Sequence, residues 1–392
     1  MDNVKYLVGT ENICNRPLEP YSQEICDFAA TLSDVLLKDE EARQYADVMT
    51  FAFWCRKGNV AAKKAKWKER RERRLGRGLV FQIAPSNVPI NFAFTYMFAL
   101  LAGNATIVRV PSREFPQIIL VCRKVNEIIG QFPEVRRRTA VVQYTADKAI
   151  TEMFSKKADA RVMWGGDKTI GNIRKCESRP RCIDLTFADR YSVCILDGKA
   201  VEQADEKCLK KLAENFYNDT FLMDQNACSS PQMIFWENVS DKAKNDFWQA
   251  VYEYAKPRYQ LQAASCVDKY TKLCQDAVDR QDLLTGSRIE NLIYRITLKE
   301  LPEDITDIRG NCGYFYEYDL QDRKELCRVI TEKFQTITYF GVEKEELGDF
   351  VIQNQVRGID RIVPVGKALD IDVVWDGYDI VEMLSRIIEV TP

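Results

Sequence analysis

The 392-residue chain has thirteen cysteines and no histidine, and these two counts limit the chemistry open to it. Histidine is the commonest general base and metal ligand in proteins, so its absence excludes Ser-His-Asp and Cys-His arrangements. An enzyme with this sequence must use Cys, Asp, Glu, Lys, Tyr or backbone groups. No CxxC motif occurs, so a structural zinc ion would need four scattered cysteines, and we expect no metal site.

Cys228 differs from the other cysteines in its surroundings. It lies in the polar loop DQNACSSPQ at 224–232, after an expected helix and before an expected strand. A thiol in an exposed loop near a helix terminus can have a lowered pKa and act as a nucleophile. Free cysteine in a helix or strand pattern is more often a small core residue, which we expect for Cys26, Cys122, Cys194 and Cys208. Context alone makes Cys228 the first candidate and leaves a structural role open.

Two turns have residues suited to binding a ligand. Asn87, in APSNVP at 84–89, could cap the following helix, with Pro89 in its first turn, or direct its amide at an oxyanion. The run WGGDKTIG at 164–171 also ends a strand and opens a helix. Such glycine-rich turns let backbone N–H groups approach a phosphate, although this run is not GxGxxG.

Short apolar runs and amphipathic stretches alternate around these turns. The runs at 79–84, 105–110, 139–142 and 160–164 read as strands, and 92–101, 116–131 and 148–155 read as helices. This alternation predicts a Rossmann-like parallel sheet, whose ligands bind beyond the carboxyl ends of the strands. The turns at 85–87, 111–113 and 165–167 are therefore expected on one rim.

The rest of the chain has weaker patterns. Residues 21–74 read as helical, and a second α/β region is expected from 201 to 365. Its predicted elements are a helix at 202–217 and strands near 233–236, 314–318 and 336–340. An amphipathic helix is expected within 375–390, packing back on the body or on another subunit.

Four strings resemble one known family. They are GLVFQIAPSNVPINFAFTYMFALLAGNATIVRVPSREFPQ, DQNACSSPQ, KFQTIT and GIDRIVPVGKALDIDVVWDGYDIVEMLSR. From about residue 78 to 386 they are similar, in order, to the fatty acyl-CoA reductases related to the bioluminescence fatty acid reductase component, within the aldehyde dehydrogenase superfamily. The resemblance implies an aldehyde dehydrogenase-like α/β fold. We expect N-terminal helices and a Rossmann-like NADP-binding domain over 1–200, a catalytic domain over 201–366, and a C-terminal segment, 367–392, that packs back or at a subunit interface.

The resemblance also implies roles for individual residues. Cys228 becomes the nucleophile, and the Asn87 amide with the Cys228 N–H becomes the oxyanion hole. Arg109 falls where the family binds the cofactor ribose, and Ser112 and Arg113 fall where it reads the 2′ position. A Ser-Arg pair favours the 2′-phosphate of NADP(H), although Glu114 follows it. The residues expected close to the cofactor pyrophosphate are Gly165, Gly166, Asp167 and Thr169.

The implied activity is NADPH-dependent reduction of a fatty acyl thioester, acyl-CoA or acyl-protein, to an aldehyde through a Cys228 acyl-enzyme. Three departures from the family pattern stand out. Gln82 replaces a histidine that relatives often have, and the water-activating glutamate of the aldehyde oxidisers has only a loose counterpart in Asp184. The glutamate that holds the nicotinamide ribose has no clear counterpart around 309–316.

Several alternatives remain open. An acyl-phosphate reductase or a CoA-acylating aldehyde dehydrogenase would share the same cysteine, oxyanion hole and sheet. An acyltransferase or an acyl-carrying subunit of a larger complex would be non-redox. Lys63–Arg77 has nine basic residues against two glutamates, which fits a solvated helix face or a site for an anionic partner such as a nucleotide phosphate, an acidic protein or RNA.

Composition sets the expected surroundings of the protein. With 46% hydrophobic and 29% charged residues the chain can bury a large core, and a net charge of −2 argues against bulk nucleic-acid binding. The longest apolar run, 92–102, is too short to span a bilayer. Free thiols and an N-terminus without a signal-peptide pattern predict a cytoplasmic protein. We expect a homo-oligomer, and the family implies an acyl-activating synthetase as partner.

Overall fold

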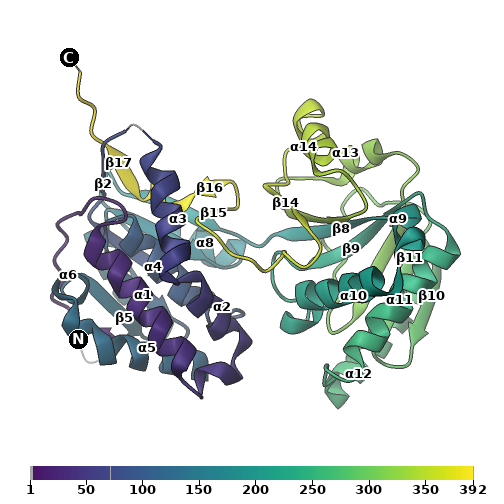
Figure 1. Cartoon of the computed structure of the whole chain (residues 1–392), viewed down its shortest axis with the longest axis horizontal. Coiled ribbons are helices and arrows are strands. Elements are labelled where there is room, and N and C mark those ends of the chain that lie inside the picture. Colours follow the sequence, from purple (N-terminus) through teal and green to yellow (C-terminus); the bar gives the residue numbers. More distant parts are fainter. Residues whose placement is uncertain (1–2, 71, 392) are drawn as a thin grey trace. The chain divides into compact units, whose positions relative to one another are not determined.

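The computed structural model describes residues 3–70 and 72–391. The chain forms two compact units (Figure 1). The first contains the residues up to Ala188 and those from Tyr378 onward, and the second is Asp189–Gly377. The C-terminal residues thus return to the first unit after the chain has built the second.

A six-stranded sheet forms the centre of the first unit. Its strands are, in spatial order, β1 (Lys5–Gly9), β5 (Thr139–Gln143), β4 (Ala105–Val110), β3 (Leu79–Ile83), β6 (Ala160–Trp164) and β7 (Ile183–Phe187). Only β1 is antiparallel to its neighbour. The runs of β-branched and apolar residues in β3, β4, β5 and β6 are buried almost throughout, as expected for parallel strands covered on both faces.

Crossover helices join the parallel strands of this sheet. They are α4 (Asn91–Leu101), α5 (Pro116–Ile128), α7 (Lys148–Lys157) and α8 (Asp167–Arg174). Every residue of α4 is buried, so this helix lies inside the unit rather than on its surface. The expected helical stretch at 21–74 is three α-helices followed by a short strand, namely α1 (Gln23–Lys38), α2 (Ala46–Trp54), α3 (Lys57–Lys68) and β2 (Arg74–Gly76).

The second unit contains a seven-stranded sheet. Its strands are, in spatial order, β10 (Leu283–Ile289), β11 (Ile293–Leu298), β12 (Tyr314–Asp319), β9 (Pro231–Glu237), β8 (Tyr191–Asp197), β13 (Phe334–Phe340) and β14 (Arg361–Pro364). All pairs are parallel except β10 with β11. Separate hydrophobic clusters are built on the sheet, with helices that include α10 (Glu206–Thr220), α11 (Asp241–Ala255), α12 (Ala263–Asp279) and α14 (Lys344–Gln353). The α/β architecture predicted from the sequence is confirmed.

The prediction of an amphipathic helix within 375–390 is wrong. Asp376 and Gly377 both have positive φ, which breaks a right-handed helix before it can form. The segment instead contains the one-turn helix α15 (Ile380–Met383) and the strand β17 (Ser385–Ile387). β17 pairs antiparallel with β2, a strand far away in sequence (Figure 1).

Several arginines of the basic segment Lys63–Arg77 form ion pairs and hydrogen bonds within the first unit. Arg70 forms ion pairs of 2.5 Å with both Asp379 and Glu382. Arg74 Nε donates to Ser385 Oγ at 2.9 Å, and Arg77 Nε donates to the Met383 carbonyl at 2.7 Å. These arginines therefore hold the returning C-terminal strand. Arg71 of the same segment lies outside the described residues.

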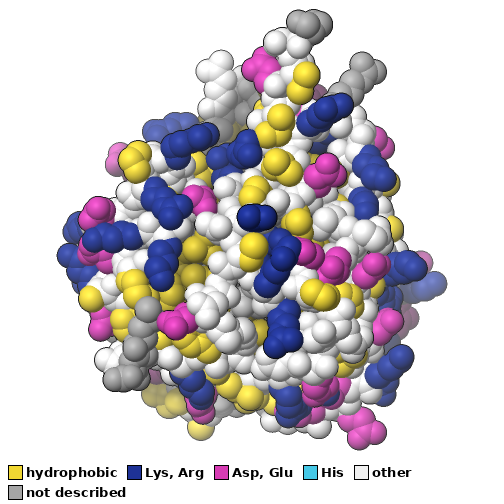
Figure 2. Space-filling model, turned by 90° about the vertical axis from the view of Figure 1, so that its left-hand side faces the viewer, with side chains coloured by type: hydrophobic (Ala, Val, Ile, Leu, Met, Phe, Trp, Pro, Cys, Tyr) yellow, Lys and Arg dark blue, Asp and Glu magenta, His cyan; other side chains and the backbone are white. Residues whose placement is uncertain are grey.

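The remaining surface and core expectations have mixed outcomes. Cys122 and Cys194 are buried and Cys26 is half-buried, but the prediction of a core position for Cys208 is wrong, because it is exposed on α10. On the face drawn in Figure 2, basic side chains are interspersed with acidic ones. Among the described residues, no helix has the length and apolar character that crossing a membrane requires.

Candidate active site

The first unit presents the predicted ligand rim at a reversal of strand order. From β3 the chain adds β4 and β5 on one side, then returns to add β6 and β7 on the other. Open α/β sheets bind ligands at the carboxyl ends of the strands beside such a reversal. The turn with Asn87 follows β3, Ser112 and Arg113 follow β4, and Gly165 follows β6. The structure therefore places these predicted residues after adjacent strands of one sheet.

Arg109 and Ser112 converge on one backbone carbonyl of this rim. Arg109 Nη2 and Ser112 Oγ donate to the Tyr144 carbonyl at 3.3 Å and 2.9 Å. The Arg109 guanidinium also lies 5.3 Å from the centre of the Tyr144 ring. Its Nε is buried and has no hydrogen-bond partner among the described groups, so this N–H still has a hydrogen bond to donate.

Arg113 is exposed beside them. Its guanidinium lies 5.1 Å from the centre of the Phe115 ring, and no ion pair to it occurs within the described residues. Glu114, which could have neutralised it, forms a 3.8 Å ion pair with Lys5 instead. The positive charge of Arg113 is thus available at the rim.

The turn after β6 exposes backbone amides at the start of α8. Gly166 is the N-cap residue, and no side chain caps the helix. The amides of Gly166, Asp167 and Lys168 have no acceptor in the part of the chain that the structure describes. A Cβ on Gly166 would meet nothing within 4 Å, so the turn is open to a ligand. Unpaired amides at a helix N-terminus bind anions, and Thr169 lies exposed in the same first turn.

Two further details of the rim differ from the simplest expectations. Gly165 donates its own N–H to the Phe187 carbonyl at 3.1 Å. This N–H is therefore not available to a ligand, and the residue contributes only the room that its missing side chain leaves. Asn87 is exposed and does not cap α4, because that helix begins at Asn91 with Ile90 as its N-cap residue. The capping role considered for Asn87 is therefore wrong, as is a place for Pro89 inside the first helical turn.

The loop with Cys228 is fixed in the second unit by two glutamines. Gln225 accepts from the Gly313 amide at 2.8 Å and donates to the Tyr314 carbonyl at 3.2 Å. Gln232 donates to the Gln225 carbonyl at 2.7 Å. These buried amides replace the backbone partners that an irregular loop lacks, and they hold the segment between α10 and β9.

Cys228 itself is held through its backbone carbonyl. Ser192 Oγ, at the start of β8, donates to this carbonyl at 2.7 Å. The Cys228 N–H has no acceptor among the described residues, which leaves it available to a ligand. The residue is only partly exposed, at the point where the loop turns into β9.

The thiol of Cys228 faces charged and amide groups. Burial, and next the Asp376 carboxylate, raise the pKa of the Cys228 thiol to about 12, while a hydrogen bond from Gln335 and the Arg190 charge lower it. The lowered pKa expected from the loop context is therefore wrong. The loop follows the C-terminus of α10, which cannot stabilise a thiolate as a helix N-terminus would. Sequence reasoning missed Gln335 and Asp376, and no local motif marks them.

The three departures from the family pattern have structural explanations. Gln82 is buried in β3, where it accepts from Thr95 Oγ1 and donates to Thr106 Oγ1 at 2.7 Å. Asp184 is held by Arg161 through two hydrogen bonds of 2.7 Å. Glu317, the carboxylate that follows 309–316, is fully buried against two tryptophan N–H groups and Arg295. All three side chains thus form hydrogen bonds with other residues of the protein.

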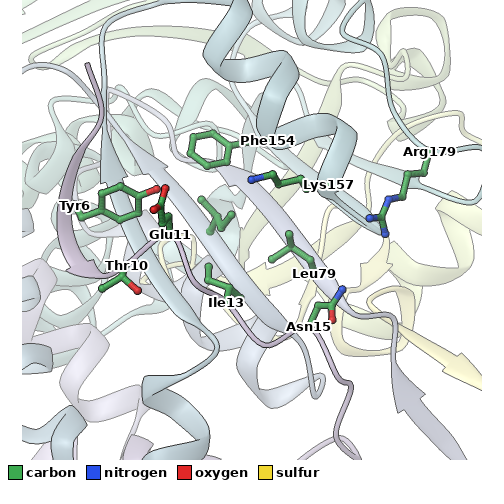
Figure 3. A pocket seen from close by; sticks show the side chains of 10 residues that line it. Tyr6, Thr10, Glu11, Ile13, Asn15, Leu79, Phe154, Lys157 and Arg179 are labelled. Carbon is green, nitrogen blue, oxygen red and sulfur yellow. The ribbon is translucent and has the colours of Figure 1, made fainter. Parts of the chain in front are cut away.

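A separate cavity of about 250 Å³ opens in the first unit (Figure 3). Apolar side chains such as Leu79 and Phe154 line it together with Lys157 and Arg179. Leu79 begins β3, so the cavity lies toward the amino end of this strand, whereas the rim lies beyond its carboxyl end. None of the predicted site residues lines it. Among the described residues no cluster of metal-ligating side chains occurs.

Solved structures with the same fold are aldehyde dehydrogenases. A variant of 1-pyrroline-5-carboxylate dehydrogenase from Thermus thermophilus superimposes with a TM-score of 0.64, 13% identity and coverage of 94% of this chain and 81% of that one. The same kind of enzyme from Thermus with bound NAD gives 0.64, 12%, 93% and 80%. Aldehyde dehydrogenase 21 from Physcomitrella patens gives 0.63, 12%, 93% and 85%. The predicted aldehyde dehydrogenase-like fold is confirmed.

Family membership follows from the sequence match. No curated protein sequence matches the chain. The profile of the family described as acyl-CoA reductase (LuxC), however, matches residues 61–387. This range includes the rim of the first unit and the cysteine loop of the second. The resemblance inferred from the four strings is confirmed, and the chain belongs to the acyl-CoA reductase (LuxC) family.

Proposed function

We propose that this protein reduces a fatty acyl thioester, acyl-CoA or acyl-protein, to an aldehyde with NADPH, through an acyl-enzyme on Cys228. The observation that carries the proposal is the setting of Cys228 in a member of the acyl-CoA reductase family. Its loop is held by the hydrogen bonds of Gln225 and Gln232, and its N–H has no acceptor among the described residues. Charged and amide groups act on the pKa of its thiol.

The chemistry begins at the Cys228 sulfur. The sulfur attacks the thioester carbonyl, and collapse of the tetrahedral intermediate releases the thiol of the acyl donor and leaves an acyl-enzyme. The oxyanion of that intermediate would be stabilised by the Cys228 N–H and the Asn87 amide. Loss of one such donor typically raises the barrier by about 3–4 kcal/mol.

The rim of the first unit fits NADP(H). Its amides at the start of α8 would hold the pyrophosphate, with Gly165, Gly166, Asp167 and Thr169 lining the turn. Arg109 would contact the ribose, and Ser112 with Arg113 would take the 2′-phosphate. The unpaired Arg109 Nε and the open space beside Gly166 support this assignment. When bound, the cofactor supplies the hydride that converts the acyl group to the aldehyde level.

The hydrogen bonds of Asp184 to Arg161 favour reduction of the acyl-enzyme over its hydrolysis. A carboxylate held by two hydrogen bonds from Arg161 is poorly suited to activate water. An acyl-enzyme without a water-activating base keeps its activated acyl group until hydride arrives. We therefore expect slow thioester hydrolysis when the cofactor is absent.

The proposal extends to the surroundings of the reaction. Residues 1–200 would bind the cofactor, 201–366 would carry the acyl group, and 367–392 would pack back or at a subunit interface. An acyl-activating synthetase would supply the acyl group to a cytoplasmic homo-oligomer of this chain. Nucleic acid has no part in this function.

The test is a Cys228→Ser variant. We expect NADPH oxidation in the presence of acyl-CoA, with trapped aldehyde as product, to be lost in this variant. The Cys228 peptide of the parent protein should gain the mass of the acyl group. Cys208→Ser, at an exposed site on α10, is the matched control and should keep parental turnover. Full turnover by Cys228→Ser would refute the assignment of the nucleophile.

A further inference from the structure

The sheet of the second unit is irregular on both sides of a buried serine, Ser192. This residue is the second of β8, which lies between β9 and β13, and it is fully buried. On one side, one step along β8 corresponds to two steps along β9, from Pro231 to Met233. On the other side, two steps along β8 correspond to three steps along β13, from Phe334 to Ile337. Such irregularities disrupt the ladder locally and are frequent beside active sites.

The Ser192 hydroxyl connects the two neighbouring segments. Its Oγ accepts from the Thr336 N–H at 3.3 Å, and Thr336 lies within the irregular part of β13. The same Oγ donates to the Cys228 carbonyl at 2.7 Å, in the loop that leads into β9. One buried hydroxyl thus supplies an acceptor to a strand N–H and a donor to the carbonyl of the proposed nucleophile.

Cys228 occupies the second position of a tight turn. The Ser230 N–H donates to the Ala227 carbonyl at 2.9 Å, which closes a turn over residues 227–230. This bond holds the two ends of the turn but not the peptide unit between Cys228 and Ser229. The N–H at the second position takes no part in closing such a turn, in agreement with a Cys228 N–H that has no acceptor among the described residues.

The central peptide of this turn is therefore held from the sheet. Ser192 belongs to a strand with neighbours on both sides, so it is a rigid point of attachment. Without it, rotation of that peptide would turn the Cys228 carbonyl oxygen away from the sheet and shift the backbone that carries the sulfur. A carbonyl oxygen near the sulfur would oppose the negative charge that develops on the acyl oxygen during attack.

We propose that Ser192 is a positioning residue for the acylation of Cys228, an inference that rests on the proposed function. Its hydroxyl holds the Cys228 carbonyl toward the sheet, so that the N–H of the same residue keeps a fixed direction and can donate to the acyl oxygen. Ser192 acts through Cys228 and needs no contact with the substrate. A misplacement of about 1 Å at a reacting centre can slow a reaction by about 100-fold.

The test compares Ser192→Ala with Thr338→Val. Thr338, in β13, is as buried as Ser192, and its Oγ1 donates to the Val193 carbonyl at 3.4 Å. The control thus loses a buried hydroxyl from the same sheet, and this hydroxyl donates to β8 rather than to the cysteine turn. Two rates are measured on the full chain. They are acylation of Cys228 without NADPH, over a range of acyl-CoA concentrations, and alkylation of Cys228 by iodoacetamide.

We expect Ser192→Ala to lower the acylation rate at saturating acyl-CoA by about 10- to 100-fold. The concentration of acyl-CoA at half-saturation should stay close to the parental value. Alkylation forms no oxyanion, so its rate should change little, and Thr338→Val should keep both rates of the parent. Unchanged acylation in Ser192→Ala would overturn the inference, and so would equal losses of acylation and alkylation, which indicate general damage to the loop.

Amide hydrogen exchange adds a measurement that needs no substrate. In Ser192→Ala the residues 224–232 should exchange faster than in the parent, whereas β11 and β12 should keep their protection. Parental exchange rates in this loop would also contradict the role of Ser192. A parent protein that is alkylated at Cys228 but never acylated by acyl-CoA would refute the proposed function instead. Whether Ser192 holds the turn would then still be decided by hydrogen exchange.

Discussion

At the scale of single residues, the rim of the first unit suggests how the cofactor is chosen. Arg113 is exposed at the rim without an ion-pair partner among the described residues, since the neighbouring Glu114 is paired with Lys5. An unpaired guanidinium after β4 can contact a 2′-phosphate, which NADPH has and NADH lacks.

Reversing this charge should therefore affect one cofactor selectively. We expect Arg113→Glu to raise the KM for NADPH by about 10- to 100-fold, the equivalent of one charged hydrogen bond, with a much smaller change for NADH. Steady-state kinetics with both cofactors measures this. Arg136→Glu, an exposed arginine that precedes the amino end of β5, is the control. Equal weakening of both cofactors by Arg113→Glu would contradict a phosphate contact.

At the scale of elements, the sequence predicts best where burial alone decides the structure. The strands β4 and β6 have the bounds expected from their apolar runs, because a strand buried on both faces needs apolar residues at every position. The structure of the segment after residue 375 is harder to predict from the sequence. Its structure depends on two positive φ angles and on β2, a partner strand from the other end of the chain.

The candidate site shows the same division. Cys228 could be singled out because its own loop is polar and rich in small residues. Gln335 and Asp376 could not be predicted in this way, because one is the second residue of a strand and the other lies in a turn far along the chain. Only in the folded second unit do these two groups act on the pKa of the Cys228 thiol. A local pattern therefore predicts a nucleophile more readily than the distant residues that act on it.

The pairing of β2 with β17 yields a prediction about the basic segment. Arg74 is 9% exposed and donates to Ser385 Oγ, at 2.9 Å, and to the Glu382 carbonyl, at 2.9 Å. We expect Arg74→Ala to lower the free energy of unfolding by about 2–4 kcal/mol, since it leaves buried acceptors unpaired. Lys66→Ala, an exposed site on α3, should change it by less than about 0.5 kcal/mol. Denaturant unfolding compares the two, and equal effects would mean that Arg74 is only a surface charge.

At the scale of the whole molecule, the path of the chain ties the stability of the first unit to residues that follow the second unit in the sequence. The chain completes the sheet of the first unit, builds the second, and returns from Tyr378 onward. The returning residues bury Val381 and Leu384, and the Leu384 carbonyl accepts from Asn104 Nδ2 at 2.9 Å. Asn104 is itself fully buried just before β4, so the return segment completes the core at the amino end of this strand, away from the rim.

Ending the chain after Gly377 should consequently weaken one unit and spare the other. The truncated protein loses β17, the partners of Arg70, Arg74 and Arg77, and the acceptor of Asn104, which together correspond to at least about 5 kcal/mol of hydrogen bonds. Amide hydrogen exchange should show lost protection in β3 and α4 and retained protection in β8 and β9. Alkylation of Cys228 should change little, because its loop belongs to the second unit. Uniform loss of protection across both units would show instead that the two unfold as one.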